Sequence, residues 1–320
     1  MNKVKYYLLI AMTLLVAPNL FAQEGTEAVE PDSAMIAEFV AYAKEAYRMD
    51  SLLNYQYGKI KLSDGLATLT LDSTFKYLNP TETKKILEEA WGNPPQDNLG
   101  MIFPDSINPY MFDGWGVIVS YVEDGYIEDD DAASIDYDGL MDSMKEDMEE
   151  ENELRKEMGY GSYQIIGWAE TPYYDAQEKK LYWAKNLFFE GSEENTLNYD
   201  IRILGRNGYL QMNAVAGLAQ LKPVKTSMQN LLARVQFSEG NTYFDFDPEV
   251  DEVAAYGIGA LVAGKLAAKA GFFKVIGIFL AKFWKFILIG GGAIIAFVKK
   301  TFFSGPAEQK EDMTQTQSEA

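Results

Sequence analysis

The sequence predicts an α+β fold: an antiparallel sheet built from hairpins and a meander with packed helices, followed by a C-terminal transmembrane helix. Two observations support the sheet and helices: hairpin and strand patterns occupy residues 58–71 and 163–237, and separate helical patterns flank them. Hairpin runs mixed with separate helices are typical of this fold class. A third observation, an apolar section near the C-terminus, predicts the membrane segment. No long linker divides residues 33–250, which indicates one large domain or two closely packed halves.

Residues 1–22 have the pattern of a secretory signal peptide. Two lysines precede the apolar run 6–16, and Ala22 is the small residue at the expected cleavage site. The apolar run is too short to span a membrane comfortably, and no cysteine follows it to carry a lipid. We therefore expect an exported chain that begins at or near Gln23.

The first predicted elements after the signal peptide are a helix and a hairpin. Apolar residues at helical spacing predict a helix over 33–48. Asp64-Gly65 predicts a two-residue turn, so that paired residue numbers in the hairpin sum to 129. The register places Ile60 and Leu69 together on an apolar face.

Two further helices flank a strand in the middle of the chain. Asn79 is the expected N-cap of a helix that ends at Gly92. Residues 115–122 read as a buried strand, and residues 136–158 as a long, very acidic helix. The apolar seam of that long helix is predicted to be Leu140, Met144 and Met148.

The most regular pattern is a hairpin over residues 198–214. Asn207 and Gly208 suit a type I′ turn, in which both residues need a positive φ, so Asn207→Val is expected to be destabilising. Paired residue numbers then sum to 415, which makes Arg202 the partner of Asn213 on a polar face that also holds Asp200.

The second half of the domain reads as a meander closed by a short helix. The expected strands are 163–169, 180–189, 197–204, 209–215 and 235–237, and the helix is 225–234. Asp247 and Pro248 are the expected N-cap and first residue of a helix that leads toward the membrane.

Residues 275–300 are predicted to cross the membrane once. From residue 254 to 304 the chain has seven lysines and no acidic residue, and the apolar run ending at Val298 is followed by Lys299-Lys300. With an exported N-terminus this lysine pair falls on the cytoplasmic side, as the positive-inside rule expects. Upstream, residues 253–270 fit an interfacial amphipathic helix, a second span that makes a hairpin, or a stalk continuous with the anchor.

Small residues recur every four positions at Ala260, Gly264 and Ala268. Such spacing lets helices approach closely and predicts possible self-association, although small residues are also simply common in membrane helices.

Composition excludes several kinds of chemistry. The chain has no cysteine and no histidine, which removes cysteine nucleophiles, Ser-His-Asp triads and ordinary zinc sites. We therefore favour a protein that is not an enzyme, and we predict no cofactor. The formal net charge of −20 argues against nucleic acid as a partner.

A candidate binding group lies in the 198–214 hairpin. It consists of Arg202, Asp200 and Asn213 on the polar face and Arg206 at the turn. The competing interpretation is that Arg202 is a solvated partner of a carboxylate and that Arg206 is simply solvated, because exposed ion pairs are common and weak.

Asp129, Asp130 and Asp131 form a candidate divalent-cation site, although acidic runs more often are solvated or cap helices. An EF-hand loop fails because Lys145 falls where a bidentate carboxylate is needed. Four tryptophans either line a ligand groove or, as their spacing favours, belong to the core. They are Trp91, Trp115, Trp168 and Trp183.

Seven sequence blocks are distinctive in combination. They are "WGNPP" at 91–95, "GWGVIVSY" at 114–121, "GYIEDDDA" at 125–132, "GWAETPYYD" at 167–175, "LYWAKNLFF" at 181–189, "TLNYDIRILGRNGYLQMNAVAG" at 196–217 and "GNTYFDFDPEVDEVAAYGIGALVAG" at 240–264. With these blocks the chain resembles the uncharacterised membrane-anchored bacterial proteins called DUF2167. The resemblance implies location and architecture, and it carries over no reaction and no catalytic residue.

Together these features favour a membrane-anchored interaction or sensing domain that faces the periplasm from the bacterial inner membrane, with an unidentified protein or small-ligand partner. The alternatives are a carboxylate-based hydrolase of envelope substrates and a divalent-cation-binding module. The expected organisation is a signal peptide at 1–22, an exported domain at 23–250, a juxtamembrane amphipathic helix at 251–274, a transmembrane segment at 275–300 and a polar tail at 301–320.

The topology can be tested with protease on right-side-out spheroplasts. We expect the exported domain to be digested while an epitope placed after Ser304 survives, because the lysine pair holds the tail inside. Loss of both signals would instead establish the two-span hairpin.

Overall fold

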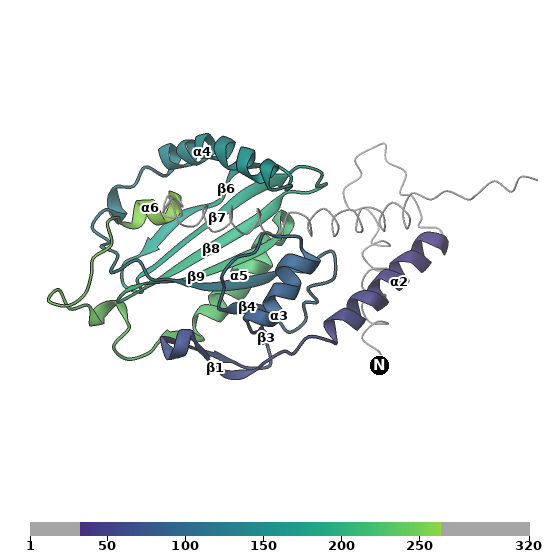
Figure 1. Cartoon of the computed structure of the whole chain (residues 1–320), viewed down its shortest axis with the longest axis horizontal. Helices are drawn as coiled ribbons and strands as arrows, with labels where there is room; N and C mark the ends of the chain where they lie inside the picture. Colours follow the sequence, from purple (N-terminus) through teal and green to yellow (C-terminus); the bar gives the residue numbers. More distant parts are fainter. Residues whose placement is uncertain (1–32, 264–320) are drawn as a thin grey trace, which may run out of the picture. The chain divides into compact units, whose positions relative to one another are not determined.

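The computed structural model describes residues 33–263, which form a seven-stranded and a three-stranded antiparallel sheet (Figure 1). The large sheet has the order β3-β4-β5-β9-β8-β7-β6, and the small sheet has the order β1-β2-β10. The strands are β1 (Gly58–Leu62), β2 (Ala67–Leu71), β3 (Phe75–Leu78), β4 (Gly100–Pro104), β5 (Gly116–Val122), β6 (Tyr163–Asp175), β7 (Lys180–Phe189), β8 (Thr196–Gly205), β9 (Gly208–Gly217) and β10 (Val235–Phe237). The predicted α+β class with antiparallel sheets is confirmed.

Helices cover both faces of the large sheet. The helices of the described residues are α2 (Ser33–Asp50), α3 (Pro80–Lys84) with its π-helical continuation η2 (Lys85–Ala90), α4 (Tyr137–Glu157), α5 (Leu221–Leu232) and α6 (Ile258–Ala263). α4 packs on β6 and on α6, α3 packs on β3 and β4, and α5 packs on β8 and β9 (Figure 1).

The main core lies between the large sheet, the small sheet and α5. It includes Leu69 of β2, Ile201 of β8, Met212 of β9 and Met228 of α5, all almost completely buried. The opposite face of the large sheet holds two smaller clusters, one with Leu87 and Phe103 near α3 and one with Met144 and Leu187 under α4. Alternate residues of each central strand therefore enter different cores, as the period of a strand requires.

The first hairpin has the predicted register. Ile60 pairs with Leu69 and Lys61 with Thr68, so the paired numbers sum to 129 as expected. The connection is longer than a two-residue turn, because the last pair is Leu62 with Ala67. The connection contains the 3-10 turn η1 (Ser63–Gly65), in which Ser63 and Asp64 have φ values of 45° and 54°. β10 adds to the other edge of β2, which makes the small sheet.

The predicted register of the second hairpin is wrong by two residues. Gly205 pairs with Gly208, so the turn residues are Arg206 and Asn207, and neither of them has a positive φ. The residue with the unusual backbone is Gly208, with a φ of 144°. A shift of two residues leaves every side chain on its predicted face, because strand side chains alternate with a period of two.

The other predicted elements in residues 79–237 are mostly confirmed. Asn79 caps α3 by accepting a hydrogen bond from the Glu82 amide, and Asp136 caps α4 by accepting one from Gly139. The seam of α4 differs in one position, because Met141, not Leu140, is buried beside Met144. β3 and β4 were not predicted, and α5 begins four residues earlier than expected.

The segment after β10 differs from the helix predicted at Asp247. Asp247 begins only a turn, closed by the Val250 amide on the Asp247 carbonyl at 3.1 Å, and Val253 then forms a β-bridge with Tyr126. The helix begins at Ile258, whose side chain is completely buried. Within the described residues, the chain after residue 250 therefore stays packed on the domain, since α6 contacts α4.

The signal peptide, the membrane segment 275–300 and the polar tail 301–320 lie outside the described residues. Within residues 33–263 no helix is both long and apolar enough to cross a membrane. Ala260 lies in α6, whereas Gly264 and Ala268 are outside the described part of the chain.

Gly208→Ala tests the corrected hairpin. A Cβ atom on Gly208 would lie 1.9 Å from the Val122 carbonyl oxygen, so β5 or the turn must move. We expect a loss of about 3 kcal/mol or more in the free energy of unfolding, measured by denaturant titration.

The matched control is Gly191→Ala, where φ is 85° but no atom lies within 4 Å of the new methyl group. It should cost only about 1–2 kcal/mol. Asn207→Val should stay within about 0.5 kcal/mol. Equal losses for Gly208→Ala and Asn207→Val would restore the original turn assignment.

Candidate functional site

Asp200 and Arg202 form a buried ion pair on one face of β8. The Arg202 Nη1 atom donates to Asp200 Oδ1 at 2.9 Å, and the two side chains are 10% and 4% exposed. The guanidinium carbon of Arg202 lies 4.8 Å from the ring centre of Trp183, which β7 brings opposite Asp200. The interpretation of Arg202 as a solvated surface residue is therefore wrong.

Asn213 lies on the same face but pairs with different residues than predicted. Its partner across β8 is Asp200, and its side-chain amide donates to Asn198 Oδ1 at 2.7 Å. Arg202 instead faces Gln211. The structure thus places Asp200, Arg202 and Asn213 on one face of the β8–β9 pair, with Asp200 between the other two as ion-pair partner of Arg202 and cross-strand neighbour of Asn213.

Arg206 is separated from that group and holds the hairpin turn to the C-terminal part of the domain. Its Nε and Nη2 atoms donate to the two oxygens of Asp251 at 2.7 and 3.0 Å. This hydrogen bonding holds the pKa of Asp251 below its usual value. The sequence analysis did not find Asp251 as the partner of Arg206, because the two residues are 45 positions apart in the sequence.

The acidic run 129–131 is divided between different partners. Asp129 accepts hydrogen bonds from Lys179, Tyr174 and Tyr243. Burial acts to raise the pKa of Asp129, but these hydrogen bonds outweigh it and hold the pKa below the usual value. Asp131 accepts the first amides of α6, from Ile258 and Gly259, at 2.9 Å each.

The geometry of the described residues does not favour the predicted cation site at Asp129, Asp130 and Asp131. Residues 33–263 contain no group of three or more Asp, Glu, His or Cys side chains arranged to hold a metal ion. Lys179 already supplies the positive charge next to Asp129, at 2.7 Å. The run instead ties β6, the β6–β7 turn and α6 together.

A groove of about 1470 Å³ lies at one end of the large sheet. At this end β7 stops at Phe189, β8 begins at Thr196 and β9 stops at Gly217. The ends of η2 and α4 and one side of α2 complete its walls. We call it the acidic groove, and its lining includes Tyr42, Glu45, Trp91, Phe112, Asp113, Arg155, Phe189, Glu190, Glu193, Glu194 and Val215.

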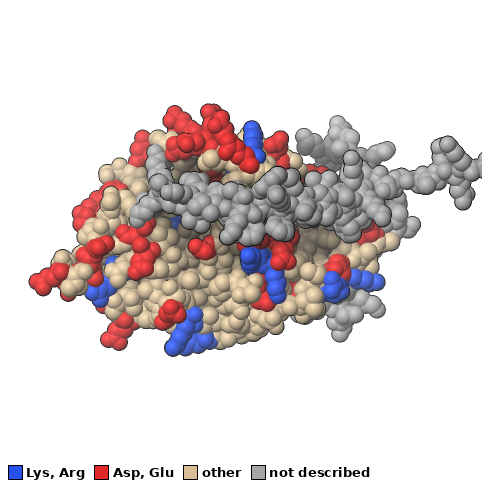
Figure 2. Space-filling model, viewed as in Figure 1, with Lys and Arg blue, Asp and Glu red and all other residues tan. Residues whose placement is uncertain are grey.

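The acidic groove has an unequal charge balance. Its lining contains five carboxylates, Glu45, Asp113, Glu190, Glu193 and Glu194, and a single basic residue, Arg155. The Arg155 Nε atom donates to the Gly161 carbonyl at 3.0 Å, and the guanidinium lies within 6 Å of the rings of Tyr160, Tyr163 and Phe189. Figure 2 shows that carboxylates also gather along α4, whose C-terminal end borders the groove.

Aromatic side chains form the apolar part of the groove. Trp91 is anchored by a hydrogen bond from its Nε1 atom to the Pro109 carbonyl at 2.9 Å. Phe112 contacts Phe39 of α2 edge to face, yet it is 76% exposed. The Tyr42 hydroxyl donates to the Tyr110 carbonyl, which holds the loop with Phe112 against α2.

The favoured prediction placed all four tryptophans in the core. It is confirmed for Trp115 and Trp183, whereas Trp91 lines the groove, as the less favoured alternative allowed. Phe112 and Phe189 were not recognised as groove residues, because Phe112 lies in a loop without a periodic pattern and Phe189 is the last residue of a strand, where the sequence does not show which surface it borders. The "WGNPP" block was the available clue, since it places a tryptophan just before a helix stop.

These features define an α+β domain on an antiparallel sheet with an open acidic groove at one sheet end. Residues 54–292 match the model of a family described as "Protein of unknown function (DUF2167)". The chain belongs to this family, as its sequence blocks indicated. No curated protein matches the chain.

Two solved structures share part of the fold at low similarity. One is the Saccharomyces cerevisiae Ran-binding protein Mog1p, with 9% identity and a TM-score of 0.29 over 58% of this chain and 96% of that one. The other is PsbP from the cyanobacterium Synechocystis, with 9% identity and a TM-score of 0.32 over 57% of this chain and 92% of that one. These similarities are too low to support an argument about function.

The buried ion pair predicts strong coupling between two substitutions. Asp200→Leu leaves the Arg202 charge buried without its carboxylate, and we expect a loss of about 3–5 kcal/mol in the free energy of unfolding. The double variant Asp200→Leu, Arg202→Met removes both charges and should recover most of this loss. Additive losses in a denaturant double-mutant cycle would show that the pair is not coupled.

Proposed function

We propose that this chain is a membrane-tethered, periplasm-facing domain that binds a basic, partly apolar polypeptide segment in the acidic groove. The observation that carries the proposal is the groove itself, with exposed Phe112 at its rim and five carboxylates in its lining.

The size of the groove favours a polypeptide over a small molecule. Its volume of about 1470 Å³ exceeds the range of about 300–1,000 Å³ that is usual for small-ligand sites. Exposed large aromatic side chains at the rim of a recess are typical of protein-binding surfaces, where they act as anchors. A segment of several residues therefore fits the recess better than a cofactor.

The charge of the lining favours lysine or arginine in the partner. Complementary charge steers association and disfavours partners of like charge. The acidic surface along α4 extends the same field beyond the groove (Figure 2). An acidic partner, and nucleic acid in particular, would be repelled.

The tether and its orientation rest on the sequence. The signal-peptide pattern of residues 1–22 and the apolar run closed by Lys299-Lys300 support export followed by anchoring. A domain held in this way meets partners at the membrane surface, which raises their local concentration.

Site-specific photo-crosslinking in intact cells tests the proposal. A photoreactive amino acid replaces Phe112, and the matched control replaces Tyr173, an aromatic residue that is 62% exposed on β6 and does not line the groove. We expect a discrete crosslink to a peptide that carries lysine or arginine from position 112, and none from position 173.

Charge reversal gives the second readout. Glu193→Lys with Glu194→Lys should reduce the crosslink severalfold, because both residues line the groove. Glu149→Lys with Glu150→Lys, on exposed positions of α4 outside the groove lining, should have a smaller effect. Equal yields at positions 112 and 173, or a crosslinked peptide rich in acidic residues, would refute the proposal.

A further inference from the structure

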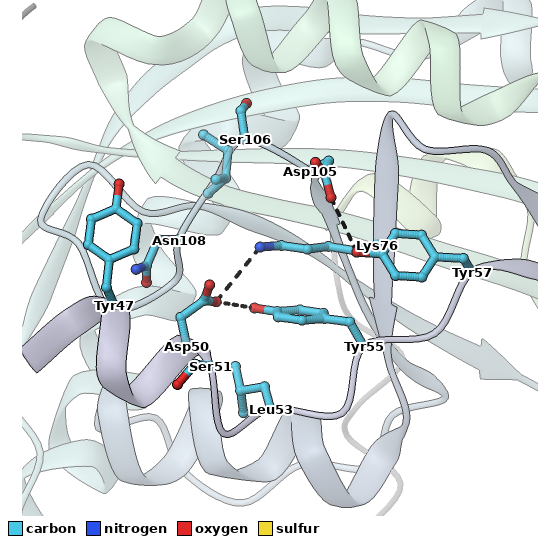
Figure 3. Close-up of a pocket in the computed structure, with 11 residues that line it drawn as sticks. Tyr47, Asp50, Ser51, Leu53, Tyr55, Tyr57, Lys76, Asp105, Ser106 and Asn108 are labelled. Carbon is cyan, nitrogen blue, oxygen red and sulfur yellow. Dashed lines mark hydrogen bonds and ion pairs between the residues drawn. The ribbon is translucent and has the colours of Figure 1, made fainter. Parts of the chain in front are cut away.

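A second recess lies between the end of α2, the segment after it, β3 and the loop that follows β4 (Figure 3). Its volume is about 300 Å³, and it shares no lining residue with the acidic groove. Asp50, Tyr55, Tyr57, Lys76, Asp105 and Asn108 supply most of its polar and aromatic surface. We call it the tyrosine cavity.

Lys76 brings a buried positive charge into the tyrosine cavity. Its side chain is 7% exposed, although β3 is otherwise apolar. The Nζ atom lies 3.7 Å from Asp50 Oδ1 and 4.2 Å from the ring centre of Tyr55. Figure 3 shows the ammonium group directed toward Asp50 across the cavity. Burying a lysine is costly unless it is paired, and Asp50 provides that pairing.

Asn108 presents a donor without a protein acceptor. The residue is 7% exposed, and its Nδ2 atom is buried with no hydrogen-bond partner. The orientation of the amide is determined, because its Oδ1 atom accepts the Tyr110 backbone amide at 2.9 Å. A buried donor that stays unsatisfied costs about 1–3 kcal/mol, so a ligand oxygen at this position would be favourable.

Two tyrosines provide walls and further polar groups. The Tyr55 hydroxyl donates to Asp50 at 2.6 Å, and the Tyr57 hydroxyl donates to Asp105 at 3.2 Å. Burial, followed by the nearby carboxylates, raises the pKa of both phenols, so they remain protonated. Tyr57 is 51% exposed and forms the outer edge of the cavity.

We infer that the tyrosine cavity binds a neutral polyhydroxylated ligand, such as one sugar ring. A ligand oxygen accepts a hydrogen bond from Asn108 Nδ2, ligand hydroxyls contact the carboxylates, and a tyrosine packs against the face of the ring. Asp50 and Asp105 disfavour an anion. Lys76 and the Asn108 donor disfavour a cation. A sugar has both donors and acceptors and a C–H face that packs on aromatic rings. The volume matches the lower end of small-ligand sites, which suits one ring.

Calorimetry on the full chain in detergent tests this inference with defined probes. The probes are glucose, galactose and N-acetylglucosamine, with inorganic phosphate and choline as the charged alternatives. We expect at least one sugar to bind with a dissociation constant on the order of 1 mM, a value typical of a small ligand, and neither charged probe to bind.

Two variants localise the binding. Asn108→Asp retains the acceptor for the Tyr110 amide but removes the free donor, and should weaken binding about tenfold. Tyr57→Ala should weaken it severalfold, whereas Tyr57→Phe keeps the wall and should bind as the parent chain does. Tyr173→Ala is the control for loss of an exposed tyrosine elsewhere.

The outcomes that overturn the inference are equally defined. They are phosphate or choline binding in place of the sugars, no binding of any sugar, or sugar binding that Asn108→Asp and Tyr57→Ala leave unchanged. The inference goes beyond the proposed partner binding and does not depend on it. Tyr57→Ala lies outside both the acidic groove and the loop that carries Phe112, so crosslinking at position 112 should be unaffected by that variant and distinguishes the two proposals.

Discussion

The pairing of β5 with β9 is the constraint on which the remaining structure depends. Seven consecutive residue pairs, from Gly116–Val215 to Val122–Tyr209, join strands that are far apart in the sequence. This ladder unites the β3–β5 half of the large sheet with the β6–β9 meander. The two halves of the domain therefore share one sheet, and the main core contains residues from both of them. Gly208 is required where the hairpin turn passes the end of β5.

Four basic residues of this acidic chain are specific internal partners of carboxylates. Arg202 pairs with Asp200, Arg206 with Asp251, Lys179 with Asp129 and Lys76 with Asp50. Three of these pairs connect segments distant in sequence, and each places a carboxylate beside a cation that burial would otherwise penalise. The carboxylates of the acidic groove are exposed, and one of them, Glu45, pairs with Arg48 on the surface at 2.6 Å. The buried pairs hold chain segments together, and the exposed groove carboxylates set the charge that a partner meets.

The loop after β4 contributes to both recesses. Its first part, through Asn108, lines the tyrosine cavity, and its continuation from Pro109 to Gly114 lines the acidic groove. The loop is held by Trp91 at the Pro109 carbonyl and by Tyr42 at the Tyr110 carbonyl. A Cβ atom on Gly114 would come within 2.7 Å of the carbonyl oxygens of Asn108 and Met111, so the loop closes tightly on itself. A single compact loop therefore positions Asn108 inside the cavity and Phe112 at the groove rim.

The sequence by itself determined the fold class, most elements and the faces of the strands, because caps, turn residues and period-two alternation act over a few residues. It identified Asn79 as a cap, the start of the long acidic helix near Asp136, and the shared strand face of Asp200 and Arg202. Only the tertiary structure decided the hairpin register, the burial of Arg202 under Trp183 and the partner of Arg206. Those outcomes depend on the approach of β5 and β7 and of the C-terminal segment, contacts that local patterns do not encode. The two recesses could not be predicted for the same reason. No sequence pattern marks Lys76, Asn108 or Phe112, because the elements that surround them come together only in the folded chain.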